Sequence, residues 1–186
     1  MNPVLQAISD RRSIRGYAPE QITMGQRDAL VKAALESPSA MDRQPWHFSV
    51  VQDRALLSEI NEAARAHAML DAASYAASRF SDPAYDVFYG APTVIFISLE
   101  KNAPAIQQID TGIAAENLAL AATGLGLGSV ILGMPREAFL SEQGDAFRAR
   151  LDFPAGYDFA IAVAVGTGTT TKPAHAEKPG KVSIIL

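Results

Sequence analysis

One segment restricts the possible folds of this chain more than any other. Residues 104–126 (PAIQQIDTGIAAENLALAATGLG) have the periodicity of a long helix, with Pro104 in the first turn and glycines at the end. Apolar side chains surround much of its circumference, so this helix has no broad polar face to turn toward water. We therefore expect it to lie in the centre of the fold, covered by other elements on several sides.

Other segments have the patterns of elements that could surround this helix. Thr23 and Gln26 have the spacing of a capping box at the start of a helix. Residues 70–90 show no regular pattern, and within them the stretch RFSDPAYDVFYG (79–90) is predicted to form an exposed loop. Helices are predicted at residues 3–13, 23–37, 54–69 and, weakly, 135–150, and strands at 46–53, 92–100, 128–133 and 157–166.

The chain ends in a proline-spotted stretch, TTTKPAHAEKPG, followed by the β-rich sequence GKVSIIL. A terminal strand reached in this way has few partners close by in sequence. It could pair with a second protomer by strand addition or exchange, or it could be an ordinary edge strand of its own sheet. Both alternatives are open at this point.

Three arginines lie within five positions near the N-terminus. In an extended segment, Arg11, Ser13 and Arg15 would share one face. Two guanidinium groups and a hydroxyl suit a phosphate group, because the planar arginine fork donates paired hydrogen bonds to its oxygens. The alternative is a solvated basic turn whose charges pair with Asp10 and Glu20.

A polar loop over residues 37–48 (SPSAMDRQPWHF) follows the second predicted helix and runs into a strand at Trp46. Its hydroxyl, amide and backbone groups could bind a flat heteroaromatic ligand. The alternative is a simple helix–strand connection with a buried tryptophan.

Composition and motif searches exclude several classes of function. The chain has no cysteine, which excludes disulfides and thiolate chemistry, and a net charge of −4 argues against nucleic-acid binding. No apolar run suits a signal peptide or a membrane span, so we expect a soluble cytoplasmic protein. The glycine-rich runs GLGLGS and GTGTTT lack the strand–helix context of a dinucleotide fingerprint, and the three histidines lack metal-ligand spacing. Glu116, alone in the long helix, could be a base or a structural residue. Because no motif supplies a clear acid, base or nucleophile, the sequence favours a cofactor that carries the chemistry.

Four stretches in register resemble the nitroreductase family of FMN-dependent enzymes: RRSIR, PSAMDRQPWHF, GAPTVIFI and DTGIAAENLALAATGLGLGSVILG. The resemblance covers nearly the whole chain and is closest to the compact branch of that family. It implies a single domain over residues 1–186, with an α+β fold, a central and mainly antiparallel β-sheet flanked by helices, and an extended tail from about residue 169. It also implies a homodimer with FMN bound between the protomers, the long helix at the interface and the tail exchanged with the partner.

The resemblance also assigns residues to the FMN site. Arg11, Ser13 and Arg15 match the phosphate-binding positions, and Arg12 is placed on the flavin side. The turn Leu132–Gly133 matches the one whose backbone N–H points at flavin N5, while His175 and Lys178 are candidates for the basic pair that closes on the phosphate. The loop that meets the flavin from the other protomer corresponds to Pro38, Ser39, Ala40, Asp42 and Gln44.

Three features depart from the family pattern. Asp42 replaces the usual asparagine, and an ionised carboxylate should disfavour an anionic reduced flavin and lower its reduction potential. VAVGTGTTT replaces the usual Gly-Tyr-Pro turn, so we expect a different tail path. Glu177 also stands where a basic residue is expected.

The function implied is ping-pong hydride transfer from NADH or NADPH through flavin N5 to a nitroaromatic or quinone-like acceptor. Alternatives on the same fold are a flavin reductase or a reductive dehalogenase, for which residues 67–90 would have to supply a lid. A flavin-binding protein without turnover and a non-flavin interaction module are the alternatives from other classes. Candidates for reading a nucleotide 2′-phosphate are Arg43, Arg65 and Arg79.

Overall fold

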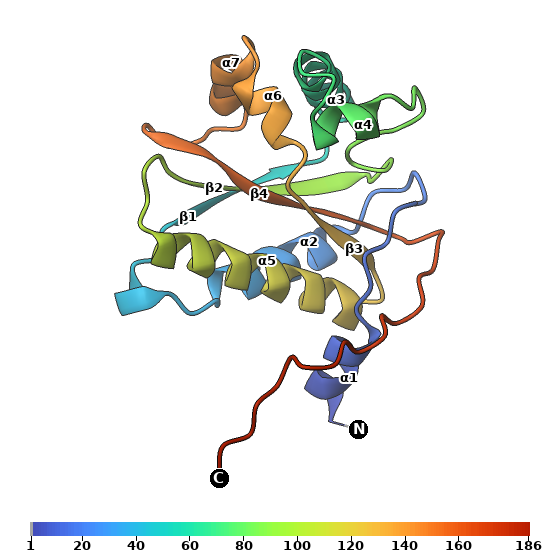
Figure 1. Ribbon diagram of the computed structural model, residues 1–186, viewed down its shortest axis with the longest axis vertical. Coiled ribbons are helices and arrows are strands. Elements are labelled where there is room, and N and C mark those ends of the chain that lie inside the picture. The colour runs from blue at the N-terminus through green and yellow to red at the C-terminus, as the bar shows by residue number, and fades with distance from the viewer. Residues whose placement is uncertain (1) are drawn as a thin grey trace.

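The computed structural model describes residues 2–186 of the chain. A four-stranded sheet with the strand order β1-β2-β4-β3 forms its centre (Figure 1). Every pairing between these strands is antiparallel, which confirms the predicted α+β class with a central antiparallel sheet. The strands are β1 (Trp46–Val51), β2 (Thr93–Glu100), β3 (Gly128–Leu132) and β4 (Tyr157–Gly166).

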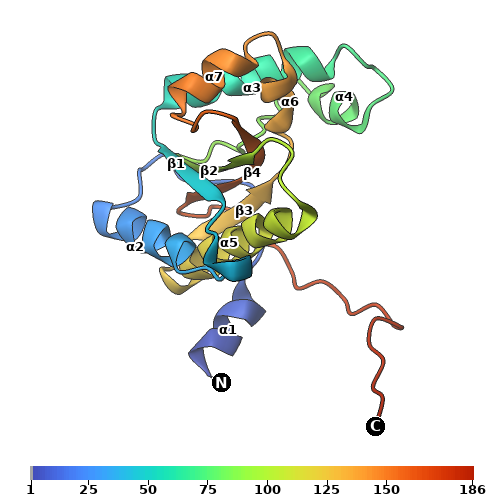
Figure 2. The same cartoon turned by 90° about the vertical axis from the view of Figure 1, so that its left-hand side faces the viewer.

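Helices cover both faces of this sheet (Figures 1 and 2). One face carries α2 (Met24–Leu35) and the long helix α5 (Ala105–Gly124). The other face carries α3 (Arg54–Ala68), α4 (Tyr75–Phe80), α6 (Arg136–Leu140) and α7 (Gly144–Arg150). The remaining elements are α1 (Pro3–Asp10) and the 3₁₀ turn η1 (Ala40–Asp42).

The sequence patterns explain why these elements form where they do. All residues of β2 except the last are buried, as a continuous apolar strand between two helical layers requires. The predicted capping box is confirmed at the start of α2, where Thr23 and Gln26 exchange side-chain and backbone hydrogen bonds. The central position predicted for residues 104–126 is confirmed only in part: α5 contacts α2, β3 and β4, but it lies in a helical layer on one face of the sheet and leaves Ile106 and Ile109 exposed.

Two local predictions are wrong. Residues 79–90 are not simply an exposed loop: they begin with the end of α4, whose N-cap is Ser74, and they bury Phe80 and Phe88 against α3 and the sheet. Residues 181–186 form no strand, because no segment among residues 2–186 pairs with them. An edge strand in the chain's own sheet is therefore excluded as the place of the tail.

The two ends of the chain project from the body (Figures 1 and 2). Helix α1 buries none of its residues, although Val4, Leu5 and Ile8 are large apolar side chains. Residues 169–186 contain no helix or strand. No helix among residues 2–186 combines the length and apolar character that crossing a membrane requires.

Candidate functional site

The arginine-rich segment is held in an extended conformation beside the start of β3. The Ile14 N–H donates to the Ser129 carbonyl over 2.9 Å, and Ser13 forms a bridge with Ser129. The base of the tail closes the other side, where the Thr169 N–H donates to the Gly16 carbonyl over 2.9 Å. Two segments that are distant in sequence, the start of β3 and the base of the tail, therefore fix this backbone.

The arginine side chains of this segment point into different pockets. Arg15 lines a pocket of about 370 Å³ together with Leu132 and Gly133. Arg12 instead lines a groove of about 460 Å³ beside the tail, and its guanidinium donates to the Ser9 carbonyl at the end of α1 over 2.6 Å. The structure therefore brings Arg15, and not Arg12, to the turn at the end of β3.

Arg11 forms an ion pair with Glu116 of α5, with 3.2 Å between Nε and Oε1. The sequence alternative in which the arginines pair with Asp10 and Glu20 is wrong, because the described residues contain no such ion pair. Glu116, which the sequence left open as a base or a structural residue, is the partner of Arg11 in this pair. Both side chains of this pair remain partly exposed, so the Arg11 guanidinium is accessible to a ligand.

The turn Leu132–Gly133 offers a backbone donor to the pocket. Gly133 is exposed just beyond the last β3–β4 pair, and its carbonyl accepts from the Arg136 N–H over 3.1 Å. Among residues 2–186, no backbone hydrogen bond outside the regular ladders is donated by the Gly133 N–H. This N–H can therefore donate to a ligand in the pocket that Arg15 also lines.

The loop over residues 38–44 has a strained backbone. Met41, Asp42 and Gln44 all have positive φ angles of 55°, 52° and 45°. Such left-handed residues are costly when they are not glycine, and they persist where the surroundings enforce them. Here the Gln44 N–H donates to Ser39 Oγ and its side-chain amide donates to Asp42 Oδ1, each over 2.9 Å.

Helix α5 holds the first part of this loop and the residue before it. The Ala40 N–H donates to the buried carboxylate of Asp110, and the Asn117 amide donates to Ser37 Oγ over 2.9 Å. Sequence analysis missed both of these anchoring residues. The loop nevertheless lies near the N-terminal end of α5, whereas residues 11–17 lie near its C-terminal end (Figure 1). Within one chain, the predicted loop and the predicted phosphate cradle therefore lie apart from each other.

The two tail candidates also lie apart from the cradle. His175 and Lys178 are exposed, and the described residues make no hydrogen bond or ion pair with either side chain. The tail leaves the body beyond Thr170, which still accepts from the Arg15 N–H over 3.4 Å.

The wall of the Arg15 pocket comes from residues 75–89, in which only Arg79 was named from the sequence, as a candidate reader of a nucleotide 2′-phosphate. Tyr75 and Arg79 of α4 and the following Tyr85 and Tyr89 line it. A tyrosine and an arginine four residues apart on a helix, followed by two further tyrosines, are the signal that could have found them. Arg65 holds this wall in place by donating to four backbone carbonyls, those of Phe80, Asp82, Pro83 and Tyr85.

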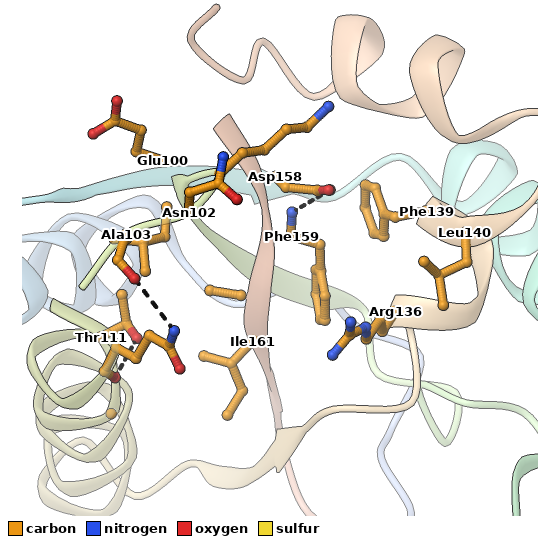
Figure 3. Close-up of a pocket in the computed structure, with 15 residues that line it drawn as sticks. Glu100, Asn102, Ala103, Thr111, Arg136, Phe139, Leu140, Asp158, Phe159 and Ile161 are labelled. Carbon is orange, nitrogen blue, oxygen red and sulfur yellow. Dashed lines mark hydrogen bonds between the residues drawn. The ribbon is translucent and has the colours of Figure 1, made fainter. Parts of the chain in front are cut away.

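A larger cavity of about 620 Å³ lies elsewhere, between the start of α5 and α6 (Figure 3). Its charged lining has both signs, with Glu100 and Asp158 opposed by Lys101 and Arg136. None of the residues predicted for the FMN site lines it. Size alone therefore does not mark the candidate site in this chain.

Comparison with known proteins identifies the family. The sequence profile of the Nitroreductase family matches residues 8–167. This chain belongs to the nitroreductase family. A relative from Archaeoglobus fulgidus, which carries the provisional name NADH dehydrogenase/NAD(P)H nitroreductase, is 36% identical over 167 residues, or 89% of this chain and 86% of the relative.

Solved structures of the nitroreductase family share the whole fold. A nitroreductase with bound FMN from Desulfitobacterium hafniense superposes with a TM-score of 0.94 at 32% identity, covering 100% of both chains. A nitroreductase with bound FMN from Bacteroides fragilis gives 0.91 at 28% identity, again over 100% of both chains. The nitroreductase fold expected from the sequence motifs is therefore confirmed.

In this nitroreductase-family chain, we expect Asp110→Ala to loosen the strained loop. The substitution leaves the Ala40 N–H without its acceptor, at a cost of about 1–3 kcal/mol for a buried donor. Hydrogen exchange measured by mass spectrometry should become at least about fivefold faster over residues 39–44. Asp110→Asn keeps an acceptor oxygen and should have a smaller effect, while equal exchange in all three proteins would contradict this anchoring role.

Proposed function

We propose that this chain is an FMN-dependent NAD(P)H oxidoreductase that reduces nitroaromatic or quinone-like acceptors. One observation carries the proposal. Arg15 and the turn Leu132–Gly133, which are far apart in sequence, line one pocket in a chain that superposes over its full length on FMN-bound members of its family.

The donor set of this region fits a flavin nucleotide. Arg11 and Ser13 offer a cation and a hydroxyl to a phosphate group, and the Arg11 guanidinium keeps an exposed face beside Glu116. Arg15 and the Gly133 N–H offer donors to the oxygen and nitrogen atoms of a planar ring. We therefore assign Arg11 and Ser13 to the phosphate and Arg15 to the ring end, and we place Arg12 toward the tail.

The bound FMN would accept a hydride from NAD(P)H and pass two electrons to the acceptor in a second half-reaction, with the balance quinone + NAD(P)H + H⁺ → hydroquinone + NAD(P)⁺. The chain supplies position and polarity. The Gly133 N–H donates at the end of β3, and the buried Leu132 side chain excludes water beneath the turn. No ionisable side chain of the pocket is needed as an acid or base for the hydride step.

We propose further that the active unit is a homodimer in which the loop 38–44 of one protomer reaches the Arg15 pocket of the other. The separation of these two parts within one chain supports this arrangement. So do the apolar side chains left exposed on α1 and at the start of α5, namely Val4, Leu5, Ile8, Ile106 and Ile109. The tail then crosses to the partner, where Lys178 and His175 approach the phosphate.

Deleting residues 181–186 should weaken this dimer. The segment carries the exposed side chains of Val182, Ile184, Ile185 and Leu186, which the single chain leaves in water. Burial of one large aliphatic side chain contributes about 1.5–3 kcal/mol, so the dimer dissociation constant should rise at least about 100-fold. Analytical ultracentrifugation measures this constant, with Thr171→Ala as the tail control. An unchanged constant would show that the apolar tail end does not contribute to the interface.

Replacing Asp42 by Asn should raise the reduction potential of the bound flavin. The substitution removes a negative charge but keeps the oxygen that accepts from the Gln44 amide. A change of about 1–3 kcal/mol in the stability of the reduced state corresponds to roughly 20–60 mV for a two-electron couple. Equilibrium titration against a reference dye measures the potential, with Asp28→Asn as a control far from the loop. An unchanged potential would mean that the Asp42 carboxylate does not face the flavin.

The proposed function is tested first by the visible absorption spectrum of the purified protein with added FMN, before and after anaerobic addition of NADH or NADPH. We expect a flavin spectrum that bleaches with at least one reductant, and parallel double-reciprocal lines in steady-state kinetics with a quinone. A bound flavin that neither reductant bleaches would instead indicate a binding protein without turnover. Failure to bind FMN at all would overturn the proposal.

A further inference from the structure

Four aromatic and cationic side chains form a continuous row along the wall of the Arg15 pocket. The Arg79 guanidinium lies over the Tyr85 ring, 4.8 Å from its centroid. The Tyr85 and Tyr89 rings meet edge to face at 5.8 Å, and the Arg15 guanidinium lies over the Tyr89 ring at 5.7 Å. The row therefore runs from α4 to the N-terminal segment and ends in a cation on each side.

The charges of this row are not neutralised by the protein. The pocket lining contains two arginines and no aspartate or glutamate. Among residues 2–186, no carboxylate forms an ion pair with Arg15 or Arg79, whereas Arg11, Arg27, Arg148 and Arg150 all have such partners. Burial, followed by its hydrogen bond with Tyr89, raises the pKa of Tyr85 to about 12, so its phenol is neutral near pH 7.

Several independent contacts hold this wall rigidly. Arg65 fixes the carbonyls before and at Tyr85, and the Asp86 carboxylate accepts from the N–H groups of Phe88 and Gly90 over 2.9 and 2.8 Å. Tyr89 itself has a positive φ of 56°, a conformation that a non-glycine residue adopts only where its surroundings enforce it. Rigid placement of cations and rings is what selective recognition of a ligand requires.

Arg65 was one of three candidates for reading an anionic group, and its four carbonyl partners remove it from that list. Arg79 differs, because its side chain is exposed at the rim of the pocket and points its charge over a ring in the lining. Tyr75 lies one helical turn before it and is also exposed. With Arg15 assigned to the cofactor, Arg79 is the cation of this pocket that remains for a substrate.

We infer that Arg79, supported by the tyrosine row, selects acceptors that carry an anionic group on an aromatic ring, such as a nitroaromatic carboxylate. This inference rests on the proposed function, since it concerns the acceptor at the same site. The ring of such an acceptor can pack on the tyrosine rings, and its carboxylate can accept paired hydrogen bonds from the planar guanidinium of Arg79. The reduction balances as ArNO₂ + NAD(P)H + H⁺ → ArNO + NAD(P)⁺ + H₂O, with the carboxylate unchanged.

The test compares 4-nitrobenzoate with its neutral methyl ester. In Arg79→Gln, the ratio of the two kcat/KM values, anion over ester, should fall roughly tenfold or more relative to the unaltered protein. Arg79→Lys keeps the charge without the planar fork, and its ratio should lie between those of Arg79→Gln and the unaltered protein. Arg27→Gln, on α2, is the control and should leave the ratio unchanged. In the oxidised FMN-bound protein, the dissociation constant of benzoate, which is not reduced, should rise by a similar factor in Arg79→Gln.

Other outcomes overturn the inference in distinguishable ways. An unchanged ratio and unchanged benzoate binding, with normal FMN content, would remove Arg79 from acceptor selection while leaving the proposed function intact. A change in the preference for NADPH over NADH without a change in the acceptor ratio would show that Arg79 reads the nucleotide phosphate instead. Protein that binds no FMN and reduces neither compound would overturn both this inference and the proposed function.

Discussion

The double variant Arg11→Ala/Ser13→Ala should bind FMN at least about 100-fold more weakly than the unaltered protein. Each charge-assisted hydrogen bond to a phosphate group contributes about 1.5–3 kcal/mol, and a loss of about 2.8 kcal/mol corresponds to a factor of 100. Quenching of FMN fluorescence on titration with apoprotein measures the dissociation constant directly. Arg11→Lys, which keeps the charge without the planar fork, should give an intermediate value.

This effect should be specific to the ligand and not a result of unfolding. Arg11 pairs with Glu116, but both side chains are partly exposed, and such pairs contribute at most about 1 kcal/mol to stability. Ser13 contributes its backbone to the bridge with Ser129, and alanine retains that backbone. The thermal midpoint of the apoprotein should therefore change little. Arg27→Ala, which removes an arginine paired with Asp28 on α2, is the matched control.

Unchanged FMN affinity in the double variant would contradict the phosphate assignment. In that case the extended segment would have only the structural role that its bridge to β3 and its contacts with the tail already describe. Weaker binding in Arg27→Ala as well would indicate a general loss of positive charge and would contradict a local cradle.

Phe139→Ala should lower the free energy of unfolding by about 3–5 kcal/mol, which is a large part of the roughly 5–15 kcal/mol typical of a domain. Phe139 is buried on α6 at the centre of an aromatic cluster. Its ring stacks on Phe159 at 4.9 Å and on Phe153 at 5.6 Å, and it meets Phe96 edge to face at 6.2 Å. Truncation leaves a cavity that these rings, held by the sheet and by α7, can fill only in part.

The loss should also affect the site. Helix α6 begins just after the turn Leu132–Gly133, so looser packing of α6 makes the position of the Gly133 N–H less defined. We expect weaker FMN binding together with the lower stability. Urea unfolding of the apoprotein measures stability, and Leu140→Ala, on the same helix but half exposed, is the control with an expected change below about 1 kcal/mol. Equal losses in the two variants would contradict the central role of the aromatic cluster.

Local patterns predicted most of the elements correctly. The cap at Thr23, the continuous apolar run of β2 and the apolar helix α5 each involve residues within a few turns of one another, so the sequence displays their causes directly. Helix α4 was missed because it spans only Tyr75–Phe80, and its stability comes from packing against α3 rather than from its own periodicity. The terminal strand was predicted from β-propensity, but a strand also needs a hydrogen-bonding neighbour.

In the candidate site, too, local motifs were predicted from the sequence, whereas contacts between distant segments were not. The family motifs identified the arginine segment, the strained loop and the turn as separate stretches. They did not predict that Arg12 would leave the pocket, that Asp110 would anchor the loop, or that Arg65 would be occupied by backbone carbonyls. Each of these outcomes depends on which side chains of distant segments come within hydrogen-bonding distance.

The sequence by itself determined most of the elements and the family, because periodicity, caps and motif spacing are properties of neighbouring residues. Only the tertiary structure decided that Arg15 and Gly133 line one pocket, that the loop lies at the other end of α5, and that Arg79 and Arg15 flank a row of tyrosines. These arrangements arise when the two helical layers pack on the sheet, since packing places residues from α4, β3 and the N-terminal segment around one pocket.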